Sequence, residues 1–120
     1  MKVTFLSLDD DNNKVYFTSD YSKVDDQIVF LDKSTPNTEI HLKIKDEEVI
    51  LERIGSVNMQ MIFNLKHLTK GFYNNDMGLD FNFQIKCHKL LCRNKKVNVE
   101  YDLILEDGQK LGHKFSLLFN

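Results

Sequence analysis

The sequence contains 120 residues, of which 42% are hydrophobic and 28% are charged, a balance typical of one folded globular domain. Sixteen basic and eighteen acidic residues leave a net charge of −2. This charge excludes the general positive field that attracts DNA or an anionic membrane. The single proline and the five glycines are scattered, so we predict one domain over residues 1–120 without a linker.

Short apolar segments recur about every ten residues, a spacing typical of an all-β sandwich or barrel. No segment carries a convincing helical pattern of apolar residues at i, i+3, i+4 and i+7. The sequence therefore predicts ten strands, at residues 3–8, 15–21, 28–31, 40–45, 49–54, 57–63, 68–73, 77–87, 97–105 and 110–119.

Whether the Arg53 side chain points to the inner or the outer face depends on two turns, and the two turns predict opposite orientations. A four-residue turn would pair Ile44 with Val49 and would set Arg53 on the inner face. A two-residue turn that begins at Gly55 would instead pair Arg53 with Asn58, on the polar face. A bulge near Gly55 would reconcile the two turns, so the facing of Arg53 stays open here. If it points inward, it needs a carboxylate from the protein or from a ligand.

The segment 77–87 shows the clearest strand pattern, because apolar and polar residues alternate throughout it. Alternation with period two is expected of a strand with one buried and one solvated face. A strand of this length beside similar neighbours predicts a large antiparallel sheet that curls or closes. Its bulky inward residues are Met77, Leu79, Phe81, Phe83, Ile85 and Cys87.

The last two strands can be placed in register, because the inward residues of both carry odd numbers. A three-residue loop at 106–108, with Gly108 in the left-handed conformation of a G1 bulge, keeps them on one face. Tyr101 and His113 then form an inward polar pair. Such a histidine suits a general base or a ligand anchor, whereas its commoner role is a core histidine satisfied by one hydrogen bond, here from the tyrosine hydroxyl. The inward pairs are Leu103–Leu111, Tyr101–His113, Val99–Phe115 and Val97–Leu117.

Reactive and basic residues gather between residues 86 and 96. Cys87, His88 and Cys92 are too few for a typical zinc site, and alternation sends Cys87 inward and His88 outward, so we predict no metal site. The basic residues lack an aromatic neighbour for stacking on bases. A solvated hairpin end whose lysines protect a strand edge is therefore favoured over nucleic-acid binding. These basic residues are Lys86, His88, Lys89, Arg93, Lys95 and Lys96.

No catalytic or cofactor motif is present, because the sequence lacks G-x-S-x-G, a phosphate loop, H-E-x-x-H and paired-carboxylate spacing. We therefore predict that the protein is not an enzyme and binds no cofactor. The two cysteines stand in a chain without an export signal, so we expect free thiols in a reducing compartment. No apolar segment approaches about 20 residues, and we expect a cytoplasmic protein.

A set of spaced motifs runs from about residue 39 to the C-terminus. It consists of VILERIG at 49–55, MIF at 61–63, Tyr73 with the Gly78–Leu79 pair, and EYDL at 100–103. By these motifs the chain resembles the YwiB-like family of small uncharacterised bacterial proteins, mostly from Firmicutes. The resemblance implies a lipocalin-like antiparallel barrel of the calycin type, without an established activity. The chain departs from the family's Thr-Pro-Tyr-Gly turn, where it has Asn75-Asp76-Met77-Gly78.

Together the patterns predict an all-β fold, a single antiparallel up-and-down barrel of eight to ten strands that is lipocalin-like or calycin-like. The bulky inward residues make a filled interior at least as expected as a cavity. Two functions stay open: binding of a small apolar or amphipathic ligand inside the barrel, and contact with a protein or RNA partner through the outer surface. No DNA or membrane partner is expected. The candidate ligand-binding residues are Arg53, Tyr73, Tyr101 and His113.

Overall fold

The computed structural model describes residues 1–120 and contains ten strands and no helix. Each segment predicted from the sequence coincides with one strand, apart from shifted ends. None of the elements is a helix with the length and apolarity needed to cross a membrane. The strands are β1 Lys2–Asp9, β2 Lys14–Val24, β3 Gln27–Leu31, β4 Thr38–Ile44, β5 Glu48–Gly55, β6 Val57–Asn64, β7 Thr69–Asn75, β8 Asp80–Arg93, β9 Lys96–Ile104 and β10 Lys110–Phe119.

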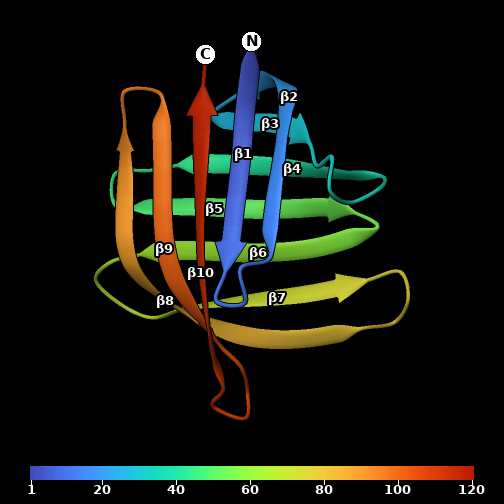
Figure 1. Cartoon of the computed structure of the whole chain (residues 1–120), viewed down its shortest axis with the longest axis vertical. Coiled ribbons are helices and arrows are strands. Elements are labelled where there is room, and N and C mark those ends of the chain that lie inside the picture. Colours follow the sequence, from blue (N-terminus) through green and yellow to red (C-terminus); the bar gives the residue numbers. More distant parts are fainter.

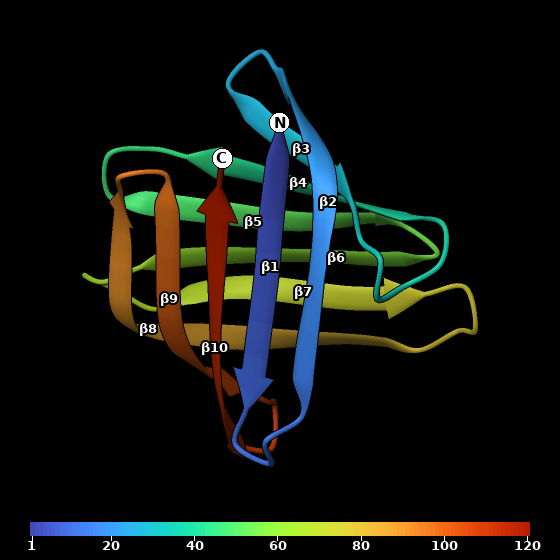
Figure 2. The same ribbon diagram turned by 45° about the horizontal axis from the view of Figure 1, so that its top comes forward.

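The strands form a closed barrel in which each strand pairs antiparallel with its sequence neighbours, and β1 pairs with β10. The predicted all-β, up-and-down barrel is therefore confirmed. Figures 1 and 2 show two layers, with β1, β2, β9 and β10 crossing β4–β7 at a steep angle. Strand β8 belongs to both layers because it bends at a bulge between Cys87 and Lys89, the feature that lets a sheet turn a corner.

The long alternating segment is correct as a strand, but its boundaries are wrong. Strand β8 begins at Asp80 and continues to Arg93, so the predicted inward residues Met77 and Leu79 lie before it and are 89% and 54% exposed. The Asn75 side-chain oxygen accepts hydrogen bonds from the backbone N–H groups of Met77 and Leu79 at 3.0 and 3.1 Å. This local turn overrides the alternation.

The predicted register of the last hairpin is confirmed. Tyr101 pairs with His113, and Leu103 pairs with Leu111. Gly108 adopts a φ of 88°, as the G1 bulge requires, and its N–H donates to the Leu105 carbonyl at 2.9 Å.

Arg53 faces the interior, because it lies opposite the inward residues Ile40 and Met59 of the two neighbouring strands. Ile44 pairs with Val49, and Arg53 pairs with Met59 rather than with Asn58. Gly55 has a φ of 146°, and a Cβ at this position would lie 2.0 Å from the Asn37 carbonyl oxygen. Only glycine fits a backbone approach of this kind, so Gly55 lets the loop between β3 and β4 pass close to the end of β5.

The middle of the barrel is filled by its own aromatic side chains. The Phe63 ring lies 4.8 Å from that of Tyr101 and 5.3 Å from that of Phe115, centroid to centroid. Phe5 stacks on Phe17 at 5.2 Å. These rings belong to one core cluster of 19 buried residues, so free space for a ligand is confined to the barrel ends and the outer surface.

Candidate functional site

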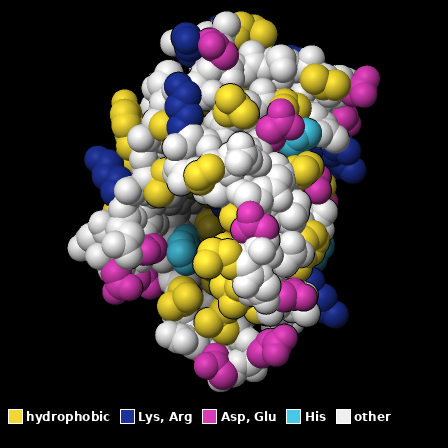
Figure 3. Space-filling view, turned by 90° about the vertical axis from the view of Figure 1, so that its right-hand side faces the viewer, with side chains coloured by type: hydrophobic (Ala, Val, Ile, Leu, Met, Phe, Trp, Pro, Cys, Tyr) yellow, Lys and Arg dark blue, Asp and Glu magenta, His cyan; other side chains and the backbone are white.

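One end of the barrel carries a row of half-buried inward side chains, which we call the Arg53 mouth. The row crosses four neighbouring strands through the pairs Arg53–Met59, Met59–Tyr73 and Tyr73–Phe81. Figure 3 looks onto this side of the molecule and shows a hollow with hydrophobic side chains on one side and a histidine with acidic side chains on the other. The cavity that touches Tyr101 and His113 has a volume of about 460 Å³ and is also lined by Asp9, Asp10 and Asp102. Half-buried aromatic and apolar walls of this kind are typical of small-molecule sites.

Arg53 is held by a buried carboxylate of the protein itself. Its Nε donates to Asp32 Oδ2 at 2.9 Å, and the Asp32 side chain is fully buried, whereas that of Arg53 is 19% exposed. The other Asp32 oxygen accepts hydrogen bonds from the backbone N–H and the hydroxyl of Ser34. The requirement for a carboxylate partner is therefore met internally, and Arg53 is not a free anchor for a ligand carboxylate.

Sequence reasoning missed Asp32, although it had established that an inward arginine needs a carboxylate. Asp32 lies directly after β3, in a loop that returns to β4 through a backbone hydrogen bond from its N–H to the Thr38 carbonyl at 2.9 Å. An apolar strand followed by a lone acid is a common pattern at the surface. Asp32 differs from such surface acids only because the inward Arg53 lies across the sheet from it.

Tyr101 is a buried neutral phenol next to this ion pair. It is 7% exposed, and burial raises the pKa of Tyr101 to about 12, although the positive charge of Arg53 acts in the opposite direction. Loss of the phenolic proton is thus strongly disfavoured. Arg53 and Tyr101 are brought near one another by the fold, as expected for two members of one site.

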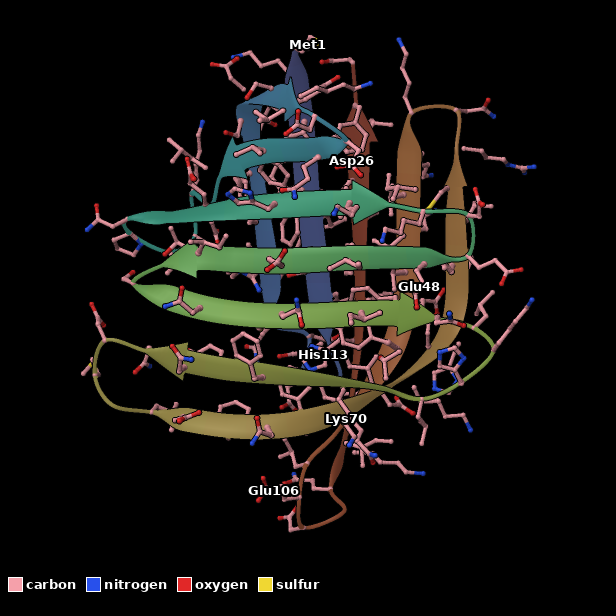
Figure 4. The ribbon with its side chains drawn as sticks, turned by 180° about the vertical axis from the view of Figure 1, so that it is seen from behind. Met1, Asp26, Glu48, Lys70, Glu106 and His113 are labelled. Carbon is pink, nitrogen blue, oxygen red and sulfur yellow. The ribbon has the colours of Figure 1, made fainter.

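His113 stacks on Tyr101, with ring centroids 5.4 Å apart and an interplanar angle of 15°. A hydrogen bond from the tyrosine hydroxyl to this histidine is expected from the sequence, but the stacked rings do not form it. The Nε2 atom of His113 is buried without any hydrogen-bond partner. Figure 4 labels His113, which is seen between β6 and β7 from behind.

The charge state of His113 follows from its surroundings. Burial lowers its pKa below the ordinary value of 6.5, against the weaker opposing influence of the carboxylates of Asp9, Asp10 and Asp102. The imidazole is therefore neutral at pH 7, with one nitrogen as donor and the other as acceptor. A buried nitrogen without a partner costs about 1–3 kcal/mol, which a ligand hydroxyl or carbonyl would recover.

Tyr73 belongs to the wall of the mouth and not to its polar centre. Its ring stacks on Phe81 at 5.1 Å with an interplanar angle of 24°. Its hydroxyl accepts a long hydrogen bond of 3.4 Å from the Asn75 side-chain amide. Of the four candidate residues, Tyr101 and His113 touch each other, Arg53 lies near Tyr101, and Tyr73 joins the set through Met59.

The cysteine and histidine cluster on β8 is divided between the two faces of the strand. Cys87 is buried on the inner face, whereas His88 lies outside and contacts Asp102 at 2.8 Å between His88 Nε2 and Asp102 Oδ2. No group of three or more His, Cys, Asp or Glu side chains is arranged to hold a metal ion. Cys92 follows the bulge and lies at the opposite end of the barrel from Arg53.

These features define a small closed antiparallel β-barrel with a filled centre and a polar group of residues at one end. Residues 8–117 match the family described as "Domain of unknown function (DUF1934)", and the chain belongs to this family. Among solved structures, the fold is similar to that of the ywiB protein from Bacillus subtilis, with a TM-score of 0.63 and 15% identity over 99% of this chain and 89% of that chain. At this identity the likeness shows the fold alone. The search of curated proteins gives no match.

The expected membership of the YwiB-like family is thereby confirmed. The calycin-like character of the barrel and the cytoplasmic setting stay predictions. The unusual turn at residues 75–78 is built by the Asn75 side chain and by Gly78, whose φ is 88°.

Proposed function

We propose that the barrel binds a small amphipathic molecule at the Arg53 mouth. The observation that carries this proposal is the buried, unpartnered Nε2 atom of His113. Buried polar atoms in folded proteins almost always have a hydrogen-bond partner. A ligand that supplies one while its apolar part packs on Met59, Tyr73 and Phe81 would fit both features of the mouth.

The ligand's polar group should carry no charge. Asp32 already neutralises Arg53, and burial keeps His113 uncharged by lowering its pKa. An anion in the mouth would meet the Asp32 carboxylate without gaining a free cation, so its desolvation would not be compensated. A hydroxyl or carbonyl group meets the neutral histidine without that cost.

The filled centre of the barrel limits the size and depth of the ligand. Phe63 and Phe115 are 0% and 5% exposed and occupy the space that an enclosed ligand would need. We therefore place the ligand at the end of the barrel, with only its head near Tyr101 and His113. This refines the expectation of a ligand inside the barrel to a shallow site.

A titration with matched short-chain probes tests the proposal. We expect n-hexanol to shift the backbone amide signals of Tyr73 and His113 in heteronuclear NMR spectra, and hexanoate to shift them less. His113→Phe keeps a ring but removes the nitrogen, so it should weaken n-hexanol binding about fivefold, as for one neutral hydrogen bond. Equal binding by the variant, or a preference for hexanoate, would refute the proposal.

Both cysteines are free thiols, which supports the proposal that the protein works in the reducing cytoplasm. The up-and-down closure of the strands supports the calycin-like comparison, because barrels of that kind take ligands through an open end.

A partner on the outer surface is the second candidate function, and one observation favours RNA over protein. A groove of about 410 Å³ on the outer face is lined in part by Lys14, Lys89 and Lys114, and also by Glu100, which contacts Lys89 at 3.7 Å. The ammonium of Lys14 lies 5.9 Å from the ring centroid of Tyr16, which is 65% exposed. The aromatic residue that the basic segment lacks in sequence is thus supplied by β2, and lysines beside an exposed ring suit a single strand of RNA.

Fluorescence anisotropy with a labelled oligouridylate at low salt would test this second candidate. Tyr16→Ala should weaken binding at least about fivefold if a base stacks on the ring. Tyr16→Phe, which keeps the ring, should bind like the unmodified protein. Unchanged binding by Tyr16→Ala would remove the stacking site from consideration.

A further inference from the structure

The barrel end opposite the Arg53 mouth contains a cleft of about 330 Å³, which we call the Cys92 cleft. Its floor is apolar: the rings of Tyr21 and Phe119 meet edge to face at 5.2 Å, and Ile28 packs beside them against the core. Cys92 pairs with Val97 across β8 and β9 and completes the floor. In Figure 1 this region lies at the top, between the β8–β9 turn and the β2–β3 hairpin.

Four cations surround this floor, and they come from two hairpins. Lys23 belongs to the β2–β3 hairpin and shares the inner face with its pair Ile28. Lys95 lies in the β8–β9 turn, and Arg93 and Lys96 flank it at the end of β8 and the start of β9. No acidic side chain lines the cleft, and none of the four cations forms an ion pair. A cluster of unpaired cations beside apolar surface attracts an anion that also has an apolar part.

The β8–β9 turn is fixed over the cleft by the backbone. The N–H of Phe119 donates to the carbonyl of Lys95 at 2.8 Å, which ties the end of β10 to the turn. Asn94 and Lys95 both have positive φ values, of 53° and 62°, as a tight two-residue hairpin turn requires. The cations therefore start from a rigid backbone, which reduces the entropy lost on binding.

Edge protection explains only part of the basic cluster. Beyond Ile85, β8 pairs with β9 alone, so lysines on its outer face do protect an open edge. Lys23 lies on a different hairpin, however, and its side chain shares a face with Ile28. Edge protection gives no reason for Lys23 to join the β8–β9 cations around an apolar floor.

We propose that the Cys92 cleft binds an amphipathic anion, a molecule with a short apolar body and a carboxylate, sulfate or phosphate head. The body packs on Tyr21, Ile28 and Phe119, and the head contacts Lys23 and the cations of the β8–β9 turn. At about 30 Å³ for each water-sized group, the cleft holds roughly ten non-hydrogen atoms. This size favours a free small molecule over a two-chain membrane lipid.

Alkylation of Cys92 provides the readout, because Cys87 in the same protein is an internal control. Cys92 is exposed and Cys87 is buried. We expect decanoate, below its micelle concentration, to slow iodoacetamide labelling of Cys92 as followed by mass spectrometry. Decanol and decyltrimethylammonium have the same chain with a neutral or a cationic head and should protect Cys92 much less. Equal protection by all three probes would contradict the role of the cations.

Charge variants then test the residues. Lys23→Gln combined with Arg93→Gln should weaken decanoate protection roughly fivefold, as expected for two partly exposed charge contacts. Lys70→Gln removes an exposed lysine elsewhere on the barrel (labelled in Figure 4) and should have no effect. Urea unfolding of each variant shows whether the barrel is intact. Full protection in the intact double variant would overturn the proposal.

Two further arms separate the Cys92 cleft from the Arg53 mouth and from a lipid-binding surface. His113→Phe should leave decanoate protection unchanged, because it alters only the Arg53 mouth. Loss of protection in that variant would show that the two ends are one site and would refute the Cys92 cleft as a separate one. Little of the protein should co-sediment with phosphatidylglycerol vesicles. If vesicles protect Cys92 from alkylation but decanoate does not, the ligand of the cleft is a lipid surface and not a free small molecule.

Discussion

The two ends of the barrel are built from similar strands but treat charge in opposite ways. At the Arg53 mouth, Asp32 neutralises the arginine, and the unsatisfied group is a neutral histidine nitrogen. At the Cys92 cleft, Lys23 and the cations of the β8–β9 turn have no carboxylate partner. Strand alternation decides which side chains face inward at both ends. The loops decide whether an inward or rim charge is compensated, and hence which ligand each end suits.

The loop acids show how this difference arises. Asp32 follows β3 and folds beneath Arg53, where its carboxylate is fully buried. Asp26 lies in the β2–β3 turn, at the other end, but contacts Lys43 at 4.0 Å. Lys23 therefore stays free although an acid stands close to it in sequence. Whether a cation has a carboxylate partner therefore depends on the path of the neighbouring loop more than on the number of acids in that loop.

The largest expected effect comes from removing the carboxylate that sets the Arg53 mouth apart. Asp32→Ala leaves an inward guanidinium without its partner, and loss of one member of a buried pair costs about 3–5 kcal/mol. Because the Arg53 side chain keeps 19% exposure, we expect about 2–4 kcal/mol, measured by urea unfolding.

The double variant Asp32→Ala with Arg53→Met is the matched control, since it removes both charges. It should recover a large part of the stability lost in Asp32→Ala. If the double variant is as unstable as Asp32→Ala, the cost comes from the loop and not from the uncompensated arginine.

A smaller loss is expected from replacing the glycine at the end of β5, next to the Arg53 mouth. Gly55→Ala places a Cβ 2.0 Å from the Asn37 carbonyl oxygen at a φ of 146°, so the loop between β3 and β4 must move. We expect a loss of about 2 kcal/mol in unfolding free energy. Gly78→Ala meets open space at a φ of 88° and should cost only about 1 kcal/mol. Equal losses would show that the close approach at Gly55 is unimportant.

The sequence was sufficient for the existence of every strand, although not for the bounds of β8, and for the register of the last hairpin. The odd-numbered inward residues of β9 and β10, together with Gly108, allow only one pairing that buries them all. Local alternation and turn chemistry are enough there, because strand partners are adjacent in sequence. The same pairing predicts that Tyr101 and His113 lie together.

Contacts between distant segments could not be predicted in the same way. Arg53 and Asp32 are 21 residues apart. The sequence contains eighteen acidic residues, and no local pattern shows which of them pairs with Arg53. Lys23 and Arg93 meet around one cleft only because the barrel closes. The exposure of Met77 could not be predicted either. Met77 fits the alternating pattern, and only the turn formed by Asn75 places it outside the strand.

The smallest expected effect is the pH response of His113, which distinguishes the neutral Arg53 mouth from the cationic Cys92 cleft. Burial lowers the pKa of His113 below 6.5, so the unfolded chain takes up a proton at a higher pH than the folded barrel does. The stability that depends on neutral His113 is therefore complete above pH 6.5 and falls as the pH drops toward the folded-state pKa. The urea midpoint should fall more between pH 7 and pH 5 in the unmodified protein than in His113→Phe.

NMR titration of the His113 ring measures the same quantity directly and tests its cause. Its midpoint should lie below 6.5, and Asp9→Asn should move it lower still, because the Asp9 carboxylate raises the pKa of His113. Asp26→Asn changes an acid at the other end of the barrel and should leave the midpoint where it is. A midpoint at or above 6.5 would mean that the imidazole is charged in part at neutral pH. A charged imidazole would then stand beside the carboxylates of Asp9, Asp10 and Asp102, and the argument for an uncharged ligand group at the mouth would fail.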